Sequence, residues 1–418
     1  MEALVARIKR SPVAHLLLAI TFFVSGVIIN LVQCVLYFCL RPCSRYLFRK
    51  INYYVAYSLY CQLVFMAEWW ADTDLYLYID KDDFKKHYGK EHGYLIMNHR
   101  YEVDWIVGWV FCERVKLLGN CKTYAKKSIQ YVPTMGWAWK FGESIFLERS
   151  WEKDKEIIGR QIRELVEYPD TIWLLLMAEG TRFTVEKHEA SCLFAHEKGL
   201  PELKHHLTPR TKGFTYSMPF LREKVGAIYD VQLVFKKKHE PTVNDLLMGK
   251  KVEAHMFVER IPLSEVPEGD EECAQWLHQL YERKDRMSDS FYHTGDFFAE
   301  SGVPRLEPFR LPRRYFSLLN TAGWSIAVLV PIMYYLIRLL TSGSTVYFSI
   351  GVAIIAIFFV LLSKMIGMTK ISKASSYGKT TATPASSPAS TPATTPTTDR
   401  KPAGSNSVGE TINQKPAD

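Results

Sequence analysis

A short apolar segment runs directly into a polar turn in Tyr94-Leu95-Ile96-Met97-Asn98-His99-Arg100-Tyr101-Glu102-Val103-Asp104. This pattern predicts a buried strand with polar side chains at its carboxyl end, where open α/β sheets hold their reactive groups. The imidazole of His99 titrates near neutral pH and can accept a proton from an alcohol. A carboxylate at Asp104, bonded to the other ring nitrogen, would fix the tautomer and stabilise the imidazolium. The spacing therefore predicts a general-base dyad.

Three further polar blocks follow in order along the chain. They are Phe146-Leu147-Glu148-Arg149, then Glu179-Gly180-Thr181-Arg182, and finally Pro209-Arg210-Thr211-Lys212-Gly213-Phe214. The second of these blocks follows another apolar run, at residues 172–177. A histidine and an aspartate five residues apart are common by chance, whereas four ordered blocks are not. The combination indicates one composite site.

These blocks resemble those of the lysophosphatidic acid (1-acylglycerol-3-phosphate) acyltransferases, over roughly residues 50–265. That family carries a histidine-four-residues-aspartate box, a phenylalanine-two-residues-arginine box and a glutamate-glycine-threonine-arginine box in this order. The extra apolar segments are similar to the multi-span eukaryotic branch with its gamma, delta and epsilon types. Two departures stand out: Gly142 lies four residues before Phe146 instead of three, and residues 225–230 lack the proline of the fourth box. We assign no role to that last segment.

The resemblance implies that the chain transfers an acyl group from acyl-coenzyme A to the sn-2 hydroxyl of lysophosphatidic acid. The product would be phosphatidic acid for phospholipid and triacylglycerol synthesis. Acyl-coenzyme A is then a co-substrate, and no cofactor is expected. The resemblance also implies a multi-pass protein of the endoplasmic reticulum membrane with its catalytic domain facing the cytosol. The implied partners are a lysophospholipid acceptor, an acyl-coenzyme A donor and the bilayer.

Individual roles follow from the chemistry of the blocks. His99 and Asp104 are the predicted catalytic pair. Guanidinium groups match phosphate oxygens through two bonds, so Arg149 and Arg182 are candidates for the acceptor phosphate. The remaining predicted substrate-binding residues are Phe146, Glu179, Gly180 and Thr181.

Two other readings stay open at this point. The acceptor can be a lysophospholipid with a larger headgroup, such as lysophosphatidylinositol. Alternatively, the chain is a membrane lipid-binding protein of the same fold without turnover, although such a protein needs no general base. A serine hydrolase is disfavoured because neither Ser144 nor Ser191 lies in a glycine-x-serine-x-glycine elbow.

The composition indicates which kinds of partner the chain binds. The chain has 418 residues and a net charge of +8, and its basic residues cluster around apolar segments, so we expect a membrane surface and no nucleic acid. His188, His196, His205 and His206 lack the regular spacing and close cysteine or carboxylate partners of a zinc site. We therefore expect no metal.

The charge pattern divides the chain into four regions. No Asp, Glu, Lys or Arg occurs between Arg10 and Arg41, which exceeds the roughly 20 residues needed to cross a bilayer. Two more such runs flank Arg338 and are separated by a short polar turn, which predicts a helical hairpin. Basic residues beside these runs favour a cytosolic catalytic domain. Arg7, Lys9 and Arg10 oppose this pattern at the N-terminus, so the first run either spans the bilayer or forms a re-entrant or monotopic pair with the helix at residues 53–66; the catalytic domain faces the cytosol in both cases. The predicted regions are an anchor with an interfacial helix at 1–72, an acyltransferase domain at 73–300, a transmembrane hairpin at 301–370 and a disordered Ser/Thr/Pro-rich tail at 371–418.

Between the membrane segments, short β-rich runs alternate with longer helical patterns. Strands are predicted at residues 94–97, 144–147, 172–177, 227–235 and 254–258, with a charged helix at 151–167. This alternation predicts an α/β domain with a largely parallel sheet and flanking helices. It would be preceded by an N-terminal membrane helix pair and followed by the C-terminal transmembrane hairpin.

Overall fold

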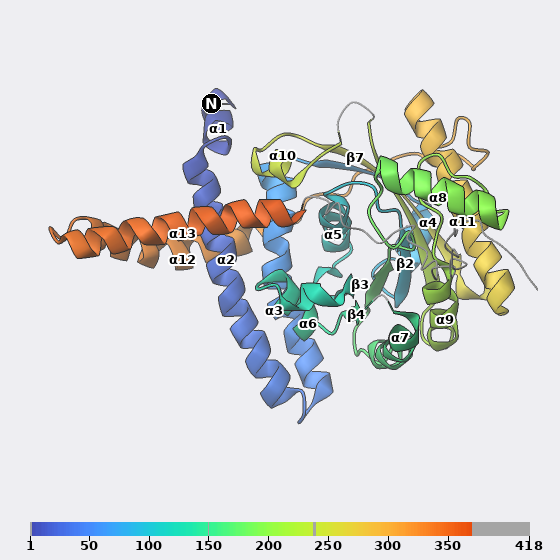
Figure 1. The fold of residues 1–418 in the computed structure, drawn as a ribbon, viewed down its shortest axis with the longest axis horizontal. Coiled ribbons are helices and arrows are strands. Elements are labelled where there is room, and N and C mark those ends of the chain that lie inside the picture. Colours follow the sequence, from blue (N-terminus) through green and yellow to red (C-terminus); the bar gives the residue numbers. More distant parts are fainter. Residues whose placement is uncertain (1, 149, 237–239, 370–418) are drawn as a thin grey trace, which may run out of the picture. The chain divides into compact units, whose positions relative to one another are not determined.

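The computed structural model describes residues 2–148, 150–236 and 240–369. A seven-stranded sheet forms its centre, in the order β1-β7-β6-β2-β5-β3-β4 (Figure 1). The strands are β1 (Asp74–Tyr78), β2 (Gly93–Met97), β3 (Cys121–Lys126), β4 (Ile145–Leu147), β5 (Trp173–Leu176), β6 (Ala227–Phe235) and β7 (Glu253–Pro262). All neighbouring pairs are parallel except β6 and β7. The predicted α/β fold with a largely parallel sheet is therefore confirmed.

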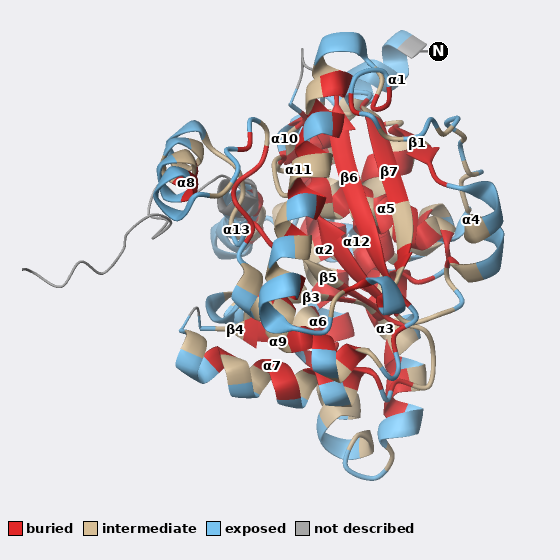
Figure 2. Cartoon of the chain, turned by 90° about the vertical axis from the view of Figure 1, so that its right-hand side faces the viewer, coloured by how far each residue is buried: buried red, intermediate tan, exposed pale blue. Residues whose placement is uncertain are grey.

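Alternating side chains of β2 supply two separate cores, because successive residues of a strand point to opposite faces. Leu95 and Met97 belong to one apolar cluster, while Tyr94 and Ile96 belong to another. Both faces of the sheet are therefore covered, and Figure 2 shows the central strands as buried. This explains why β2 reads as a continuous apolar run.

Helices from different parts of the chain cover the two faces. The first face packs against α3 (Arg45–Phe65) and α5 (Asp104–Arg114). The second packs against α7 (Trp151–Leu165), α9 (Thr211–Leu221) and α11 (Asp270–Thr294). Shorter or peripheral helices are α1 (Glu2–Lys9), α4 (Lys81–His87), α6 (Met135–Phe141), α8 (Val185–Lys198) and α10 (Val243–Leu247).

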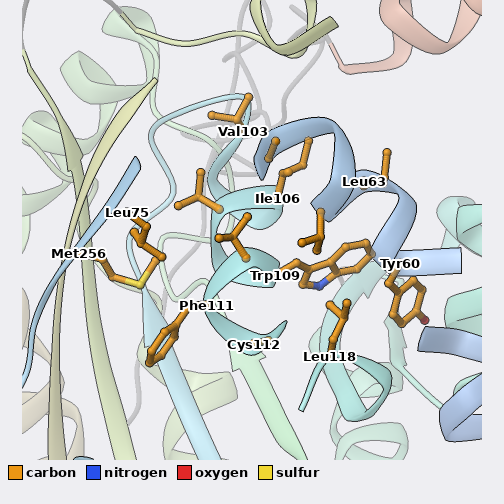
Figure 3. Close-up of a cluster of buried hydrophobic side chains, with 14 of the residues drawn as sticks. Tyr60, Leu63, Leu75, Val103, Ile106, Trp109, Phe111, Cys112, Leu118 and Met256 are labelled. Carbon is orange, nitrogen blue, oxygen red and sulfur yellow. The ribbon is translucent and has the colours of Figure 1, made fainter. Parts of the chain in front are cut away.

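The interfacial helix expected within residues 1–72 is long, and one of its faces packs into the core. It begins at Arg45 as α3 and continues through a π-helical turn to Trp70. Tyr60 of α3 packs on Trp109 of α5 with ring centroids 4.4 Å apart, and both appear in the apolar cluster of Figure 3. α3 thus fixes α5, whose first residue is Asp104.

Three described helices are long and apolar enough to cross a membrane. The first is α2 (Pro12–Val35) with its π-helical extension to Leu40, and the others are α12 (Phe316–Leu340) and α13 (Thr345–Thr369). Leu16 and Ile20 of α2 pack against Val328 of α12. α12 and α13 run crosswise to α2 in Figure 1. The predicted tail at 371–418 lies outside the described residues, and the predicted domain boundaries stay predictions.

Candidate active site

The His99–Asp104 pair lies where β2 ends and α5 begins. The Nδ1 of His99 lies 3.2 Å from Oδ2 of Asp104, and the same oxygen accepts a 2.9 Å hydrogen bond from the backbone N–H of Tyr101. Asp104 is fully buried, whereas about a quarter of the His99 side chain is exposed. With Nδ1–H donating to the carboxylate, the lone pair of Nε2 is left for a substrate. Within the described residues Nε2 has no hydrogen-bond partner.

Burial raises the pKa of the Asp104 carboxyl, and the hydrogen bond and charge of His99 oppose that shift. Its Oδ1 is buried without a hydrogen-bond partner among the described residues. The carboxylate nevertheless sits in the first turn of α5, where the partial positive charge of the helix N-terminus favours an anion. The site thus holds a carboxylate whose strongest side-chain interaction is with the imidazole.

Glu179 joins two loops at the site. It is buried, its Oε1 accepts the backbone N–H of His99 at 2.8 Å, and its Oε2 accepts the backbone N–H of Leu207 at 3.0 Å. Both bonds are charge-assisted and therefore strong. Glu179 lies three residues after the end of β5, and β5 is a parallel neighbour of β2. The carboxyl ends of these two strands consequently meet at one edge of the sheet.

Two further contacts fix the turn after β2. The side-chain amide of Asn98 donates to the carbonyl of Leu233 at 2.9 Å and accepts the N–H of Leu233 at 2.8 Å, which extends the pairing between β2 and β6. The N–H of Phe183 donates to the carbonyl of His99 at 2.8 Å. Backbone groups on both sides of His99 are therefore held by neighbouring segments.

The loop of residues 179–182 brings Arg182 beside the dyad. Burial lowers the pKa of the half-buried Arg182, while the negative charges of Glu102 and Asp104 act in the opposite direction. The loop is secured from α8 by Lys187, whose ammonium group donates to Oγ1 of Thr181 at 2.8 Å and to the carbonyl of Arg182 at 3.0 Å. The hydroxyl of Thr181 therefore accepts an internal bond from the protein.

Gly180 is needed for its backbone and for its lack of a side chain. Its φ of +70° lies in the left-handed region, and a Cβ there would stand 2.9 Å from Cδ of Arg210. Arg210 is exposed, and its N–H donates to the carbonyl of Ala178 at 2.8 Å. We assigned Arg210 no role from the sequence, although its block was the fourth of the ordered set. The structure places this guanidinium over the Glu179–Arg182 loop.

Phe146 lies apart from the dyad. It is buried in β4, which is three strand positions from β2, or roughly 14 Å at the usual strand spacing. The end of β4 still faces the same sheet edge as the end of β2, because the strands between them are parallel. Arg149 lies outside the described residues. The structure thus brings His99, Asp104, Glu179, Gly180, Thr181 and Arg182 together and places Phe146 along the same edge.

A buried ion pair supports β2 from the second face of the sheet. Lys284 of α11 is fully buried and donates to Asp230 of β6 and to the carbonyl of Val231 at 2.7 Å. Asp285 of the same helix accepts from His206 at 2.9 Å, and its two oxygens also accept the backbone N–H groups of Lys204 and His205. α11 therefore anchors both β6 and the loop that leads to Arg210. Nothing in the order of the blocks indicated this network.

The histidines downstream of the dyad have structural partners. His188 bonds to the carbonyl of Leu203 at 2.6 Å, and His205 bonds to Asp289 at 2.9 Å. In the part of the chain that the structure describes, no three His, Cys, Asp or Glu side chains converge as metal ligands do.

Comparison with known proteins assigns this chain to a class. A family model described as "Acyltransferase" matches residues 79–216, and one described as "Acyltransferase C-terminus" matches residues 245–324. The first match contains the dyad and the 179–182 loop. The chain is thus an acyltransferase by family.

Full-length relatives narrow the class. The 1-acyl-sn-glycerol-3-phosphate acyltransferase delta of Homo sapiens is 41% identical over 371 residues, which cover 89% of this chain and 96% of that protein. The gamma protein of Homo sapiens is 42% identical over 376 residues, covering 90% and 97%. This chain belongs to the 1-acyl-sn-glycerol-3-phosphate acyltransferase family, in the branch of the gamma and delta proteins. Among solved structures, the lysophosphatidic acid acyltransferase PlsC of Thermotoga maritima is similar with a TM-score of 0.41 and 14% identity, over 66% of this chain and 97% of that one.

Proposed function

We propose that this protein transfers a fatty acyl chain from acyl-coenzyme A to the sn-2 hydroxyl of lysophosphatidic acid, giving phosphatidic acid. The observation that carries the proposal is the buried Asp104 bonded to Nδ1 of a partly exposed His99. This arrangement leaves one imidazole nitrogen available for a substrate hydroxyl. The named relatives act on 1-acyl-sn-glycerol 3-phosphate, which supplies such a hydroxyl.

The reaction needs a single general base. Nε2 of His99 takes the proton of the acceptor hydroxyl as that oxygen attacks the thioester carbonyl carbon. The new C–O bond forms, the C–S bond breaks, and the imidazolium returns the proton to the leaving thiolate. Asp104 holds the ring and offsets the charge of the imidazolium. Glu179 positions His99 through the backbone.

Arg182 is the phosphate-binding residue of the proposal. Its guanidinium lies within electrostatic reach of Asp104, so a phosphate bound there would hold the acceptor beside the dyad. Arg210 approaches the same loop over Gly180. Two guanidinium groups, one from the 179–182 loop and one from the segment that leads into α9, suit a phosphomonoester, which carries close to two negative charges at neutral pH.

The membrane placement belongs to the same proposal. α12 and α13 would cross the bilayer of the endoplasmic reticulum as a hairpin. Because α2 runs crosswise to them, α2 and α3 would then lie along the cytosolic leaflet, next to the catalytic domain. In sealed microsomes, a cysteine introduced at Ser342 should be protected from a soluble maleimide, and one at Lys204 should react.

An acceptor panel tests the proposed function. Purified protein receives one acyl-coenzyme A and, in turn, lysophosphatidic acid, lysophosphatidylinositol, lysophosphatidylserine and lysophosphatidylcholine. The Asp104→Asn variant is the matched control. We expect Asp104-dependent product with lysophosphatidic acid well above that with the other acceptors. Equal or higher turnover of a diester acceptor would contradict the proposed substrate.

A further inference from the structure

A cavity lies between the start of α3 and the end of α7. Its volume is about 320 Å³, and it is lined by Arg45, Tyr46, Arg49, Arg163, Glu164, Glu167 and Pro169. α7 leads into β5, so the cavity lies at the amino ends of the parallel strands. His99 follows the carboxyl end of β2, at the opposite edge of the sheet. The cavity is therefore separate from the dyad.

The cavity holds more uncompensated positive than negative charge. Glu164 is within 3.3 Å of Arg41 and 3.9 Å of Arg45, and Glu167 is within 3.6 Å of Lys224. Both acidic side chains are thus already paired with basic side chains. Arg163 is exposed and packs over a phenyl ring, and among the described residues it has no ion-pair partner.

Arg49 gives the inner wall a fixed positive charge. Its side chain is only 4% exposed, and its Nε donates to Oε2 of Glu143 at 2.8 Å. Its Nη1 donates to the carbonyl of Glu167 at 3.2 Å, and the guanidinium stacks over the ring of Tyr168, 4.1 Å from the ring centroid. Arg49 is therefore a fixed positive charge at the back of the cavity. Phosphate oxygens are the acceptors that fit arginine best.

The cavity adjoins an apolar surface on α2 and α3. Large apolar side chains are exposed along one stripe of α2, at Val27, Ile28, Leu31, Val32, Val35 and Phe38. Leu47, Ile51 and Tyr54 are likewise exposed on α3, with helical spacing. Tyr46, which lines the cavity, is itself 63% exposed. An exposed apolar stripe beside a basic cavity is the arrangement that suits an acyl chain and its phosphate headgroup.

We propose that the Arg45–Arg49–Arg163 cavity binds the phosphate of an anionic phospholipid of the bilayer, whose acyl chains lie against the apolar surface of α2 and α3. Such a lipid is a bound membrane component and not the substrate. It would hold the α2–α3 end against α7 and orient the catalytic domain on the membrane. The proposal depends on α2 and α3 facing lipid, and it does not depend on which acceptor is acylated.

Native mass spectrometry of the full chain in detergent tests this. The protein is titrated with dioleoyl phosphatidylserine or dioleoyl phosphatidylcholine, and bound lipid is counted. We expect tighter binding of phosphatidylserine and a loss of roughly tenfold or more in the Arg45→Gln/Arg163→Gln variant, because charge-assisted bonds are removed. The control is Lys198→Gln/Arg286→Gln, which removes the same charge from exposed positions on α8 and α11 and should bind as the unmodified protein does.

Three outcomes would overturn the proposal: equal binding of the two lipids, equal losses in both double variants, or displacement of phosphatidylserine by inorganic phosphate at the same concentration. The last result would indicate a site for a soluble anion. If the Arg45→Gln/Arg163→Gln chain does not fold, Arg163→Gln alone decides, since Arg163 is exposed and forms no ion pair with a described residue.

Discussion

Replacing Glu179 by Gln should uncouple His99 from the loop that carries Arg210. Glu179 accepts two backbone N–H groups, those of His99 and Leu207, with one carboxylate oxygen each. Glutamine has one acceptor oxygen, so its NH2 group must face one of these donors. One charge-assisted bond, on the order of 1.5–3 kcal/mol, is lost, and a buried N–H is left without an acceptor.

We expect kcat to fall roughly 10- to 100-fold, because the free energy of this bond holds the base in position. The KM for acyl-coenzyme A should change little, because the side chain of Glu179 bonds only to backbone groups, whereas the KM for lysophosphatidic acid should rise as the loop that carries Arg210 shifts. Steady-state assays with purified protein in proteoliposomes measure all three quantities.

Glu189→Gln on α8 is the matched control, since this glutamate is exposed and should tolerate the change. The reasoning would be refuted if the Glu179→Gln protein, folded by circular dichroism, turned over at the normal rate. It would also be refuted if the loss appeared entirely in the KM for acyl-coenzyme A.

The other predictions concern the arginine loop and pH. Arg182→Ala should raise the KM for lysophosphatidic acid and lower kcat/KM roughly 10- to 100-fold. Arg182→Lys should restore only part of this loss, since a point charge cannot replace the two-pronged guanidinium. If only the KM for acyl-coenzyme A rose, Arg182 would belong to the donor site. Gly180→Ala should impair turnover more than Gly199→Ala, because both glycines have a positive φ but only the first substitution would place a Cβ against Arg210. Equal losses of turnover would mean that backbone strain alone causes them. Burial lowers the pKa of His255 to about 4, so the unfolded chain binds a proton there below about pH 6.5 and the folded chain does not. Stability should therefore fall by about 3 kcal/mol as pH drops from 6.5 to 4, and urea unfolding of His255→Gln should show a shallower fall; identical slopes would count against this assignment.

The elements of this fold that depend on a short stretch of residues could be predicted from the sequence. β2, β5 and β6 are apolar runs bounded by polar turns, and the charged amphipathic pattern of α7 is equally plain. β3 is not predicted because it mixes polar and apolar residues, whereas β1 alternates leucine and tyrosine after Asp74, a β-rich pattern that could have been used. The antiparallel pairing of β6 and β7 was also missed. Residues 236–252 join the two strands, and a connection of this length is compatible with either orientation.

In the site, too, contacts between residues close in sequence could be predicted and contacts between distant segments could not. His99 and Asp104 lie five residues apart, so their contact follows from one turn between a strand and a helix. The contacts of Glu179 with Leu207 and of Lys284 with Asp230 join distant segments, and no spacing encodes them. A carboxylate inside the fully buried β6 is nevertheless a signal that could have been used, since a buried charge requires a buried partner.

The most direct test of the general-base assignment is His99→Ala, assayed for transfer from acyl-coenzyme A to lysophosphatidic acid in proteoliposomes. His196→Ala serves as the control, because its side chain is 82% exposed and lies on α8. With protein amount and membrane insertion matched, the account predicts a loss of roughly 10²–10⁴-fold for His99→Ala and none for His196→Ala. Near-normal turnover by the His99→Ala protein would contradict the assignment of His99 as the base.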